Sequence, residues 1–185
     1  MSDDGRSMSI GPRSATELIV EDTRWQTIDG LPDTLDAAVS ALAGHDALQG
    51  RTLPASILLC DDARVQALNA QFRGKDTSTN VLSFPSGDDD YIGDIALAFE
   101  TVTREARDGG LACTSHASHL VVHGLLHLLS YNHERDDDAM VMELIEVDVL
   151  ASLGIADPYG DLKRGKAGSP DLHSAQTIDE TAGAS

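Results

Sequence analysis

Three closely spaced histidines are the residues of this chain best suited to chemistry: His123, His127 and His133, in the segment VVHGLLHLLSYNHERDDD. His123 and His127 are four residues apart in an apolar run, so on a helix their imidazoles lie on one face, one turn apart. His133 follows a short segment where the chain can leave the helix and fold back. Three imidazoles can then bind one ion and leave a tetrahedral position for water. The spacing predicts a catalytic zinc site, since all three ligands are nitrogens.

Other polar residues lie near this trio in the sequence. His119 precedes His123 by one helical turn, and we expect a core or supporting residue there rather than a fourth ligand. Glu146 could reach the site, but we expect it to face outward and form a surface ion pair. Residues 136–138 are acidic and are expected to begin the last helix rather than bind metal.

The spacing of apolar residues, together with the glycines and prolines that interrupt it, predicts the strands and helices that must position these histidines. Strands are expected at residues 17–21, 55–60, 80–84 and 91–99. Helices are expected at residues 32–42, 62–72, 100–108, 114–129 and 136–153. This order predicts an α/β (α+β) fold, a small four-stranded mixed sheet with about five helices packed on it. Residues 1–15 and 162–185 lack a period, so we expect a disordered N-terminal tail and a flexible C-terminal tail around one catalytic domain, residues 16–161.

The composition is that of a small globular enzyme with an unusually acidic body. The 185 residues are 41% hydrophobic and carry a formal net charge of −18, which taken alone argues against an RNA or DNA partner. The sequence contains no run of about eighteen apolar residues, so it predicts no membrane span. The N-terminus lacks a secretion signal, and we therefore expect a cytoplasmic protein. Cys60 and Cys113 are expected to be reduced thiols.

The histidine spacing also occurs in metzincin proteases, whose pattern is HExxHxxGxxH. In this chain Gly124 follows the first histidine, where those proteases have the glutamate that acts as general base. Glycine cannot accept the proton, so a metzincin-like metalloprotease is the less favoured alternative.

Two sequence blocks together resemble the YbeY family of bacterial endoribonucleases. One is HxxHxVVHGLLHLLxYxH, followed by an acidic stretch, MELIE and LGIADPYGD. The other is LNAQFRGKDTSTNVLSFP, followed by Gly93-Asp94-Ile95. The two blocks and their spacing cover residues 68–159, and each block alone is only suggestive.

The resemblance implies a zinc-dependent, single-strand-specific endoribonuclease that acts in 16S rRNA 3′-end maturation and ribosome quality control. It implies His123, His127 and His133 as ligands of one Zn²⁺ per chain in a cleft, with Arg73 and His123 as catalytic residues. The implied partners are single-stranded RNA and the ribosome or its small subunit, with no DNA and no membrane. Arg73 also suits this chemistry by itself, because a guanidinium grips a phosphodiester with two hydrogen bonds.

The chain departs from the family pattern at two positions, where the family usually has Gly and Asp. Ser130 takes the place of the glycine, so we expect a turn through positive φ that costs about 1 kcal/mol. Asn132 replaces the aspartate and removes a charge beside the metal.

A further alternative is a ribosome assembly factor that contains structural zinc and does not cleave RNA.

Overall fold

The computed structural model describes residues 7–9, 15–88, 90–131, 136–160 and 176–177. Its strands are β1 (Ser7–Ser9), β2 (Glu17–Val20), β3 (Ala55–Cys60), β4 (Val81–Pro85), β5 (Gly93–Ala98) and β6 (Gln176–Thr177). Its α-helices are α1 (Leu31–Ala43), α2 (Asp62–Arg73), α3 (Phe99–Asp108), α4 (Cys113–Leu128) and α5 (Asp136–Ser152). Two 3₁₀ helices, η1 (Thr23–Thr27) and η2 (Asp46–Leu48), precede and follow α1. None of the helices in these ranges is both long and apolar enough to cross a bilayer.

The sheet confirms the predicted mixed architecture. Its strand order is β1-β2-β3-β5-β4-β6, in which β2, β3 and β5 are parallel and β4 is antiparallel to β5. The four predicted strands form the body of the sheet. The two short strands β1 and β6 extend its edges and lie in segments that were expected to be tails. Their three and two residues are too short to show an alternating pattern in the sequence.

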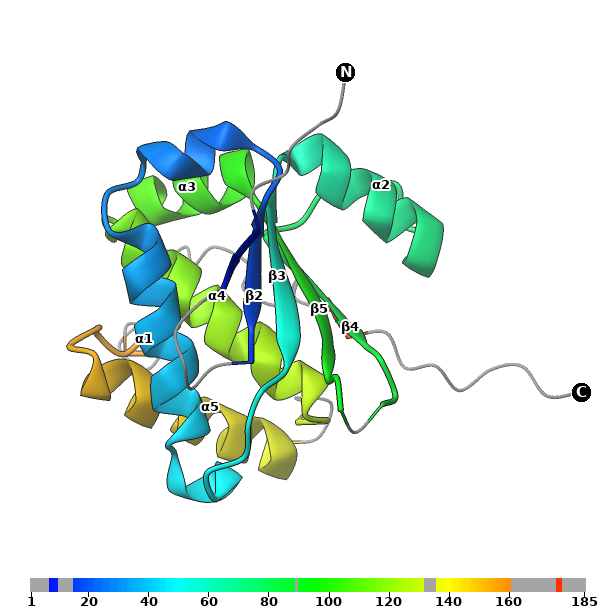
Figure 1. Cartoon of the computed structure of the whole chain (residues 1–185). Helices are drawn as coiled ribbons and strands as arrows, with labels where there is room; N and C mark the ends of the chain where they lie inside the picture. The colour runs from blue at the N-terminus through cyan, green and yellow to red at the C-terminus, as the bar shows by residue number, and fades with distance from the viewer. Residues whose placement is uncertain (1–6, 10–14, 89, 132–135, 161–175, 178–185) are drawn as a thin grey trace, which may run out of the picture.

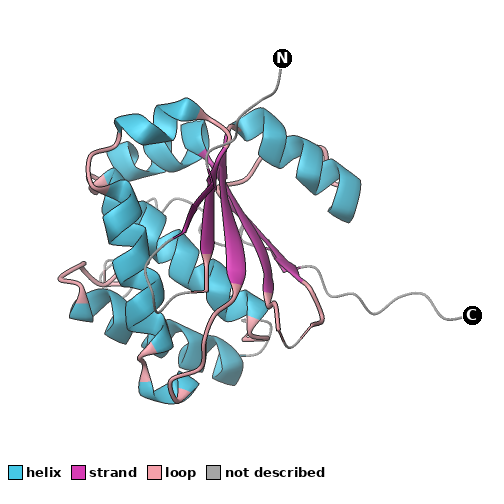
Figure 2. Cartoon of the chain, in the orientation of Figure 1, coloured by secondary structure: helices cyan, strands magenta, loops and turns pink. Residues whose placement is uncertain are grey.

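The helices divide unequally between the two faces of the sheet. α1, α3, α4 and α5 lie on one face and α2 lies on the other (Figures 1 and 2). Alternate residues of the strands supply the two cores. In β3, Ile57 and Leu59 belong to the large core, and Cys60 belongs to the small one under α2. The continuous apolar run of this strand therefore reflects burial on both faces, as its sequence predicted.

Helix α4 is the centre of the large core. Most of its residues are buried, including three of its histidines: His116, His119 and His127. Contacts with α1, α3, α5 and two strands surround it. The helix begins at Cys113, one residue before the predicted start, and follows Ala112, which provides no side-chain cap. A helix buried on all sides holds any polar group it carries away from water, and such groups need partners within the protein.

Candidate metal centre

His123 and His127 project from α4 toward one another. Their Nε2 atoms are 3.0 Å apart, and the ring centroids are separated by 4.5 Å. The four-residue spacing on one helix predicted this arrangement, and the structure confirms that the two rings lie together.

The outer nitrogen of each ring is held by an oxygen that can only accept a hydrogen bond. His123 Nδ1 donates to Glu146 Oε1 at 2.8 Å, and His127 Nδ1 donates to the Tyr131 carbonyl oxygen at 3.1 Å. Neutral imidazoles held in this way carry their proton on Nδ1 and direct an Nε2 lone pair at the other ring. Two lone pairs at this separation are stabilised by a cation between them, either a shared proton or a metal ion, so this pair fits a metal ion.

Glu146 is the carboxylate that organises the site from α5. It is completely buried, and its second oxygen, Oε2, accepts hydrogen bonds from His119 Nε2 at 3.1 Å and from the Tyr159 hydroxyl. The expectation that Glu146 would face outward is therefore wrong. Burial would raise the pKa of Glu146, but the hydrogen bonds from His119 and His123 outweigh it and hold the pKa below its usual range. Glu146 is thus ionised.

Tyr159 closes this network from the turn after α5. Its ring packs edge-on against His119, with centroids 5.8 Å apart. Burial and then the negative charge of Glu146 raise the pKa of the Tyr159 hydroxyl, which keeps it protonated as a donor. A hydroxyl and two imidazoles therefore form one continuous network around the buried Glu146 carboxylate.

His119, His123 and Glu146 offer a second possible metal position, since one ligand atom from each lies within 4.8 Å of the others. In that arrangement, however, both carboxylate oxygens already accept hydrogen bonds from the imidazoles. An ion bound there would have to replace those bonds. An ion bound at the facing Nε2 atoms of His123 and His127 would replace a single contact, the one between those two atoms. We therefore favour Glu146 and His119 as groups that orient His123 rather than as ligands.

The end of α4 forms a Schellman turn that positions the acceptor of His127. The Tyr131 N–H donates to the Leu126 carbonyl at 3.0 Å, and the Ser130 N–H donates to the His127 carbonyl at 2.9 Å. Ser130 has φ 67°, which confirms the predicted turn through positive φ. Because this turn reverses the chain, the Tyr131 carbonyl oxygen reaches back to His127 Nδ1.

The remaining predicted ligand, His133, lies outside the described residues, and so does Asn132. The described part of the chain therefore brings together two members of the predicted trio. Tyr131 immediately precedes the undescribed segment 132–135.

His116 lies outside the network of Glu146. Its Nε2 is 2.8 Å from Glu105 Oε2 on α3, and the same oxygen accepts a hydrogen bond from Asn80 Nδ2 at 3.1 Å. This group joins α3, α4 and the start of β4. Its role is consistent with packing rather than with chemistry.

Arg73 is the last residue of α2 and reaches β4 from the opposite face of the sheet. Its Nη2 donates to the Ser83 carbonyl at 3.3 Å. Burial lowers the pKa of Arg73 to about 10, so the guanidinium is still charged at neutral pH. Ser83 lies against Gly124, the residue after His123. Arg73 is therefore anchored to the strand that packs on the histidine helix.

Packing explains why position 124 is a glycine, which could not be read from the sequence. A Cβ there would lie 3.0 Å from both Ile95 Cδ1 and Ser83 Oγ. Glycine thus allows α4 to approach the sheet closely, and this position faces β4 and β5. A glutamate could not be accommodated here, which argues further against metzincin chemistry.

Sequence reasoning missed the inward orientation of Glu146 and the part played by Tyr159. A signal for the first was present. The buried residues of α5 recur at positions 142, 145, 146, 149 and 150, so Glu146 belongs to the stripe that an amphipathic helix turns to the core. An acid within such a stripe needs a buried partner, and α4 has the histidines that provide one.

Comparisons with known proteins agree with the sequence blocks and the fold. A family model described as Endoribonuclease YbeY matches residues 21–154. A protein of that description from Maricaulis maris is 48% identical over 149 residues, which are 79% of this chain and 92% of that protein. Another, from Rhodospirillum rubrum, is 49% identical over 156 residues, 75% of this chain and 78% of that protein.

A solved structure has a similar fold. The solution structure of TM1509 from Thermotoga maritima matches with a TM-score of 0.52 and 23% identity, over 84% of this chain and 97% of that chain. This likeness concerns the fold alone. The family model and the relatives, which match most of the sequence, establish the classification: the chain belongs to the YbeY family of endoribonucleases.

Proposed function

We propose that this chain is a zinc-dependent endoribonuclease that cuts single-stranded RNA in the cytoplasm. The observation that carries the proposal is the pair of facing Nε2 atoms of His123 and His127, each ring oriented by an acceptor on its Nδ1. The proposal is supported by curated relatives that are described as endoribonucleases. Its biological role would be maturation of the 3′ end of 16S rRNA and ribosome quality control, with the small ribosomal subunit as partner.

The proposed ligands of one zinc ion are His123, His127 and His133. Imidazoles suit zinc, and three of them leave one position open for catalysis. When bound, the ion supplies Lewis-acid polarisation of a phosphoryl oxygen and makes water more acidic. The protein orients the ligands: the Glu146 carboxylate and the Tyr131 carbonyl hold the two imidazoles in the tautomer that can bind a cation.

The proposed role of Arg73 is to bind a non-bridging oxygen of the scissile phosphate. A guanidinium provides two parallel hydrogen bonds and stabilises the charge that develops in the transition state. Lys75, two residues further on, is exposed and adds positive charge on a chain whose net charge is −18. This local attraction would offset the repulsion between RNA and the acidic body.

A direct test is cleavage of a labelled single-stranded RNA with and without chelator, with the matched duplex as control. We expect cleavage of the single strand only, abolished by chelator and by His123→Ala. His116→Ala is the matched control, because His116 lies on the same helix but hydrogen-bonds to Glu105 instead of Glu146. A folded, zinc-loaded protein that leaves RNA intact would favour the assembly-factor alternative.

The ligand assignment is tested by metal analysis of purified variants. Zinc content should fall sharply when His123, His127 or His133 is replaced by alanine, and most of it should remain in His116→Ala. Metal binding energy is partly folding energy, so the three ligand variants should also melt at a lower temperature. Near-stoichiometric zinc in His133→Ala would remove that residue from the site.

The role of Arg73 is tested by charge-conserving and charge-reversing changes. Cleavage should drop at least about tenfold in both Arg73→Lys and Arg73→Glu, because lysine keeps the charge but loses the two-bond geometry. RNA binding should weaken more in Arg73→Glu. Zinc content and cooperative unfolding should be unchanged, and loss of either in Arg73→Lys would make the residue structural.

A further inference from the structure

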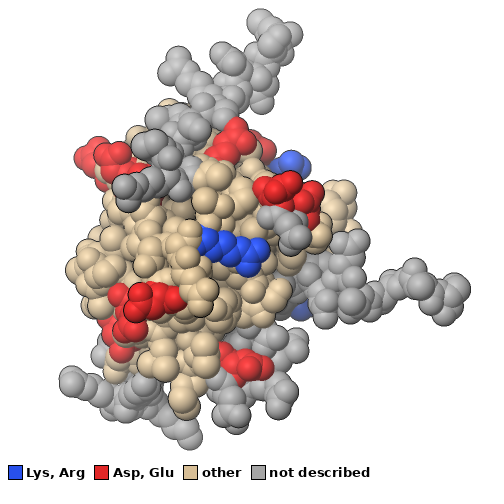
Figure 3. All heavy atoms as spheres, turned by 60° about the horizontal axis from the view of Figure 1, so that its bottom comes forward, with Lys and Arg blue, Asp and Glu red and all other residues tan. Residues whose placement is uncertain are grey.

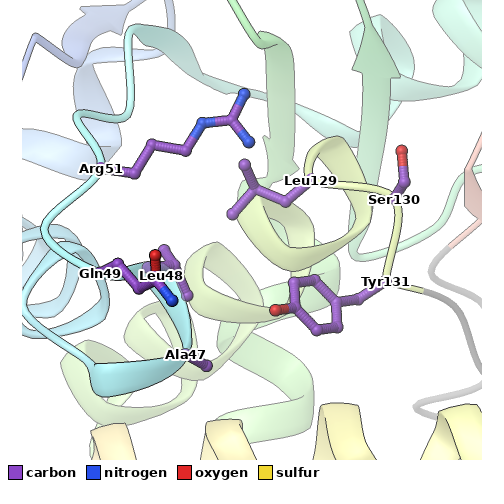
Figure 4. Close-up of a pocket in the computed structure, with 7 residues that line it drawn as sticks. All are labelled: Ala47, Leu48, Gln49, Arg51, Leu129, Ser130 and Tyr131. Carbon is purple, nitrogen blue, oxygen red and sulfur yellow. The ribbon is translucent and has the colours of Figure 1, made fainter.

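A hollow of about 350 Å³ lies beside the end of α4, lined by residues 47–49, Arg51 and residues 129–131. We call it the Arg51 hollow. Figure 4 shows that two segments far apart in the sequence form it: the loop after α1 and the turn that follows α4. Its volume lies within the range of small-ligand pockets, roughly 300–1,000 Å³.

One wall of the Arg51 hollow is also part of the candidate metal centre. The turn at residues 129–131 gives its Tyr131 carbonyl oxygen to His127 Nδ1, while the Tyr131 ring lines the hollow. A ligand bound in the hollow would therefore lie next to the turn that holds His127, one of the proposed metal ligands.

The backbone around the hollow is strained on both sides. Among the residues that the structure describes, only Gln49 (φ 51°) and Ser130 (φ 67°) are non-glycine residues with positive φ. Both line the Arg51 hollow. Both residues end helices, Gln49 after η2 and Ser130 after α4, so two tight helix-ending turns fix the backbone that forms the hollow.

The side chains of the hollow combine one cation with aromatic, apolar and amide groups. Arg51 is exposed, and no ion pair or side-chain hydrogen bond engages its guanidinium within the described residues. In Figure 4 the guanidinium and the Tyr131 ring lie on opposite sides of Leu129, and Gln49 lies on the loop across from Tyr131. Figure 3 shows acidic patches separated by largely uncharged surface, on which basic side chains are few. An arginine with no acidic partner among the described residues is therefore notable on a chain of net charge −18.

This chemistry matches an unpaired nucleotide. A base stacks on an aromatic ring, a guanidinium binds the phosphate, and an amide can donate to and accept from the edge of the base. We propose that the Arg51 hollow binds one unpaired nucleotide of the RNA beside the cleaved bond, with its base on Tyr131 and its phosphate on Arg51. This inference rests on the proposed ribonuclease function and adds a subsite to it.

The test measures affinity for a fluorescent single-stranded RNA with metal-free protein, so that cleavage does not interfere. We expect Arg51→Ala to weaken binding and to lower the slope of log K against log salt by about one. Tyr131→Leu, which keeps the backbone carbonyl, should weaken binding about fivefold or more. Tyr131→Phe should bind as the parent does. Arg107→Ala is the matched control, since Arg107 is exposed and lies outside the hollow.

Replacing single nucleotides of the RNA by abasic ones locates the subsite. At one position the abasic change should weaken binding to the parent but have little effect on Tyr131→Leu, because the stacking contact is already lost there. Equal affinity of Arg51→Ala, Tyr131→Leu and the parent would overturn the subsite and leave the ribonuclease proposal intact. A parent that neither binds nor cuts the RNA would overturn both.

Discussion

Replacing Ser130 by glycine should stabilise the protein. Ser130 has φ 67° and occupies the turn that ends α4. A left-handed conformation costs an L-residue roughly 1–2 kcal/mol, whereas glycine adopts it freely. Glycine also gains freedom in the unfolded chain, which reduces the benefit by about 0.4–1 kcal/mol. The expected net gain is about 0.5–1 kcal/mol, or a melting temperature about 1–4 °C higher for a chain of 185 residues.

The measurement is thermal and urea unfolding of metal-free protein, because a bound ion would add its own stabilisation. Ser130→Ala should give no gain, since alanine keeps the Cβ that makes the conformation unfavourable. Ser40→Gly is a matched change at an exposed serine within α1, and there glycine should destabilise by about 0.5 kcal/mol. A melting temperature several degrees lower in Ser130→Gly, or an equal gain in Ser130→Ala, would refute the assigned strain.

Three further outcomes follow from other contacts. Burial raises the pKa of the Cys60 thiol from 9.0 to about 12, so the folded protein should react slowly with Ellman's reagent at pH 8. As pH rises, the thiol of the unfolded chain loses its proton before that of the folded chain, so the free energy of unfolding should fall between pH 9 and pH 12. Gly93→Ala should cost more than about 3 kcal/mol in urea unfolding, because its Cβ would lie 2.2 Å from the Phe84 carbonyl oxygen at φ 137°. Tyr159→Phe should weaken zinc binding about tenfold in chelator competition, whereas Tyr91→Phe, in a hydrogen-bonded pair away from the site, should not.

The local elements of this fold could be predicted because each is encoded by nearby residues. The strand at residues 55–60 is one uninterrupted apolar run, and its predicted bounds are those observed. Asp61 caps α2 by accepting from the Arg64 N–H, as an acid before a helix is expected to do. Gly154 follows α5 and has the left-handed conformation, so this glycine in the sequence also indicated where that helix ends.

The candidate site could be predicted only where it depends on a single helix. The spacing of His123 and His127 fixes their proximity whatever the rest of the chain does. The position of Glu146 depends on how α5 packs against α4, and that of Tyr159 depends on the turn beyond α5. Such relations arise from tertiary packing, which a linear pattern does not contain. The apolar stripe of α5 did contain a signal that Glu146 is buried, although we expected this residue to face outward.

The histidine row of α4 also bears on why the chain has one packing rather than several. Because α4 is apolar on most sides, burial alone would tolerate a helix rotated or shifted by one turn. Glu105 on α3 pairs with His116, while Glu146 on α5 pairs with His119 and His123. Another register would leave the completely buried Glu146 carboxylate without its imidazole partners, at a cost of several kcal/mol. We infer that these pairs select the native arrangement among competing compact states, so a correctly folded chain already has its histidines aligned before any ion arrives.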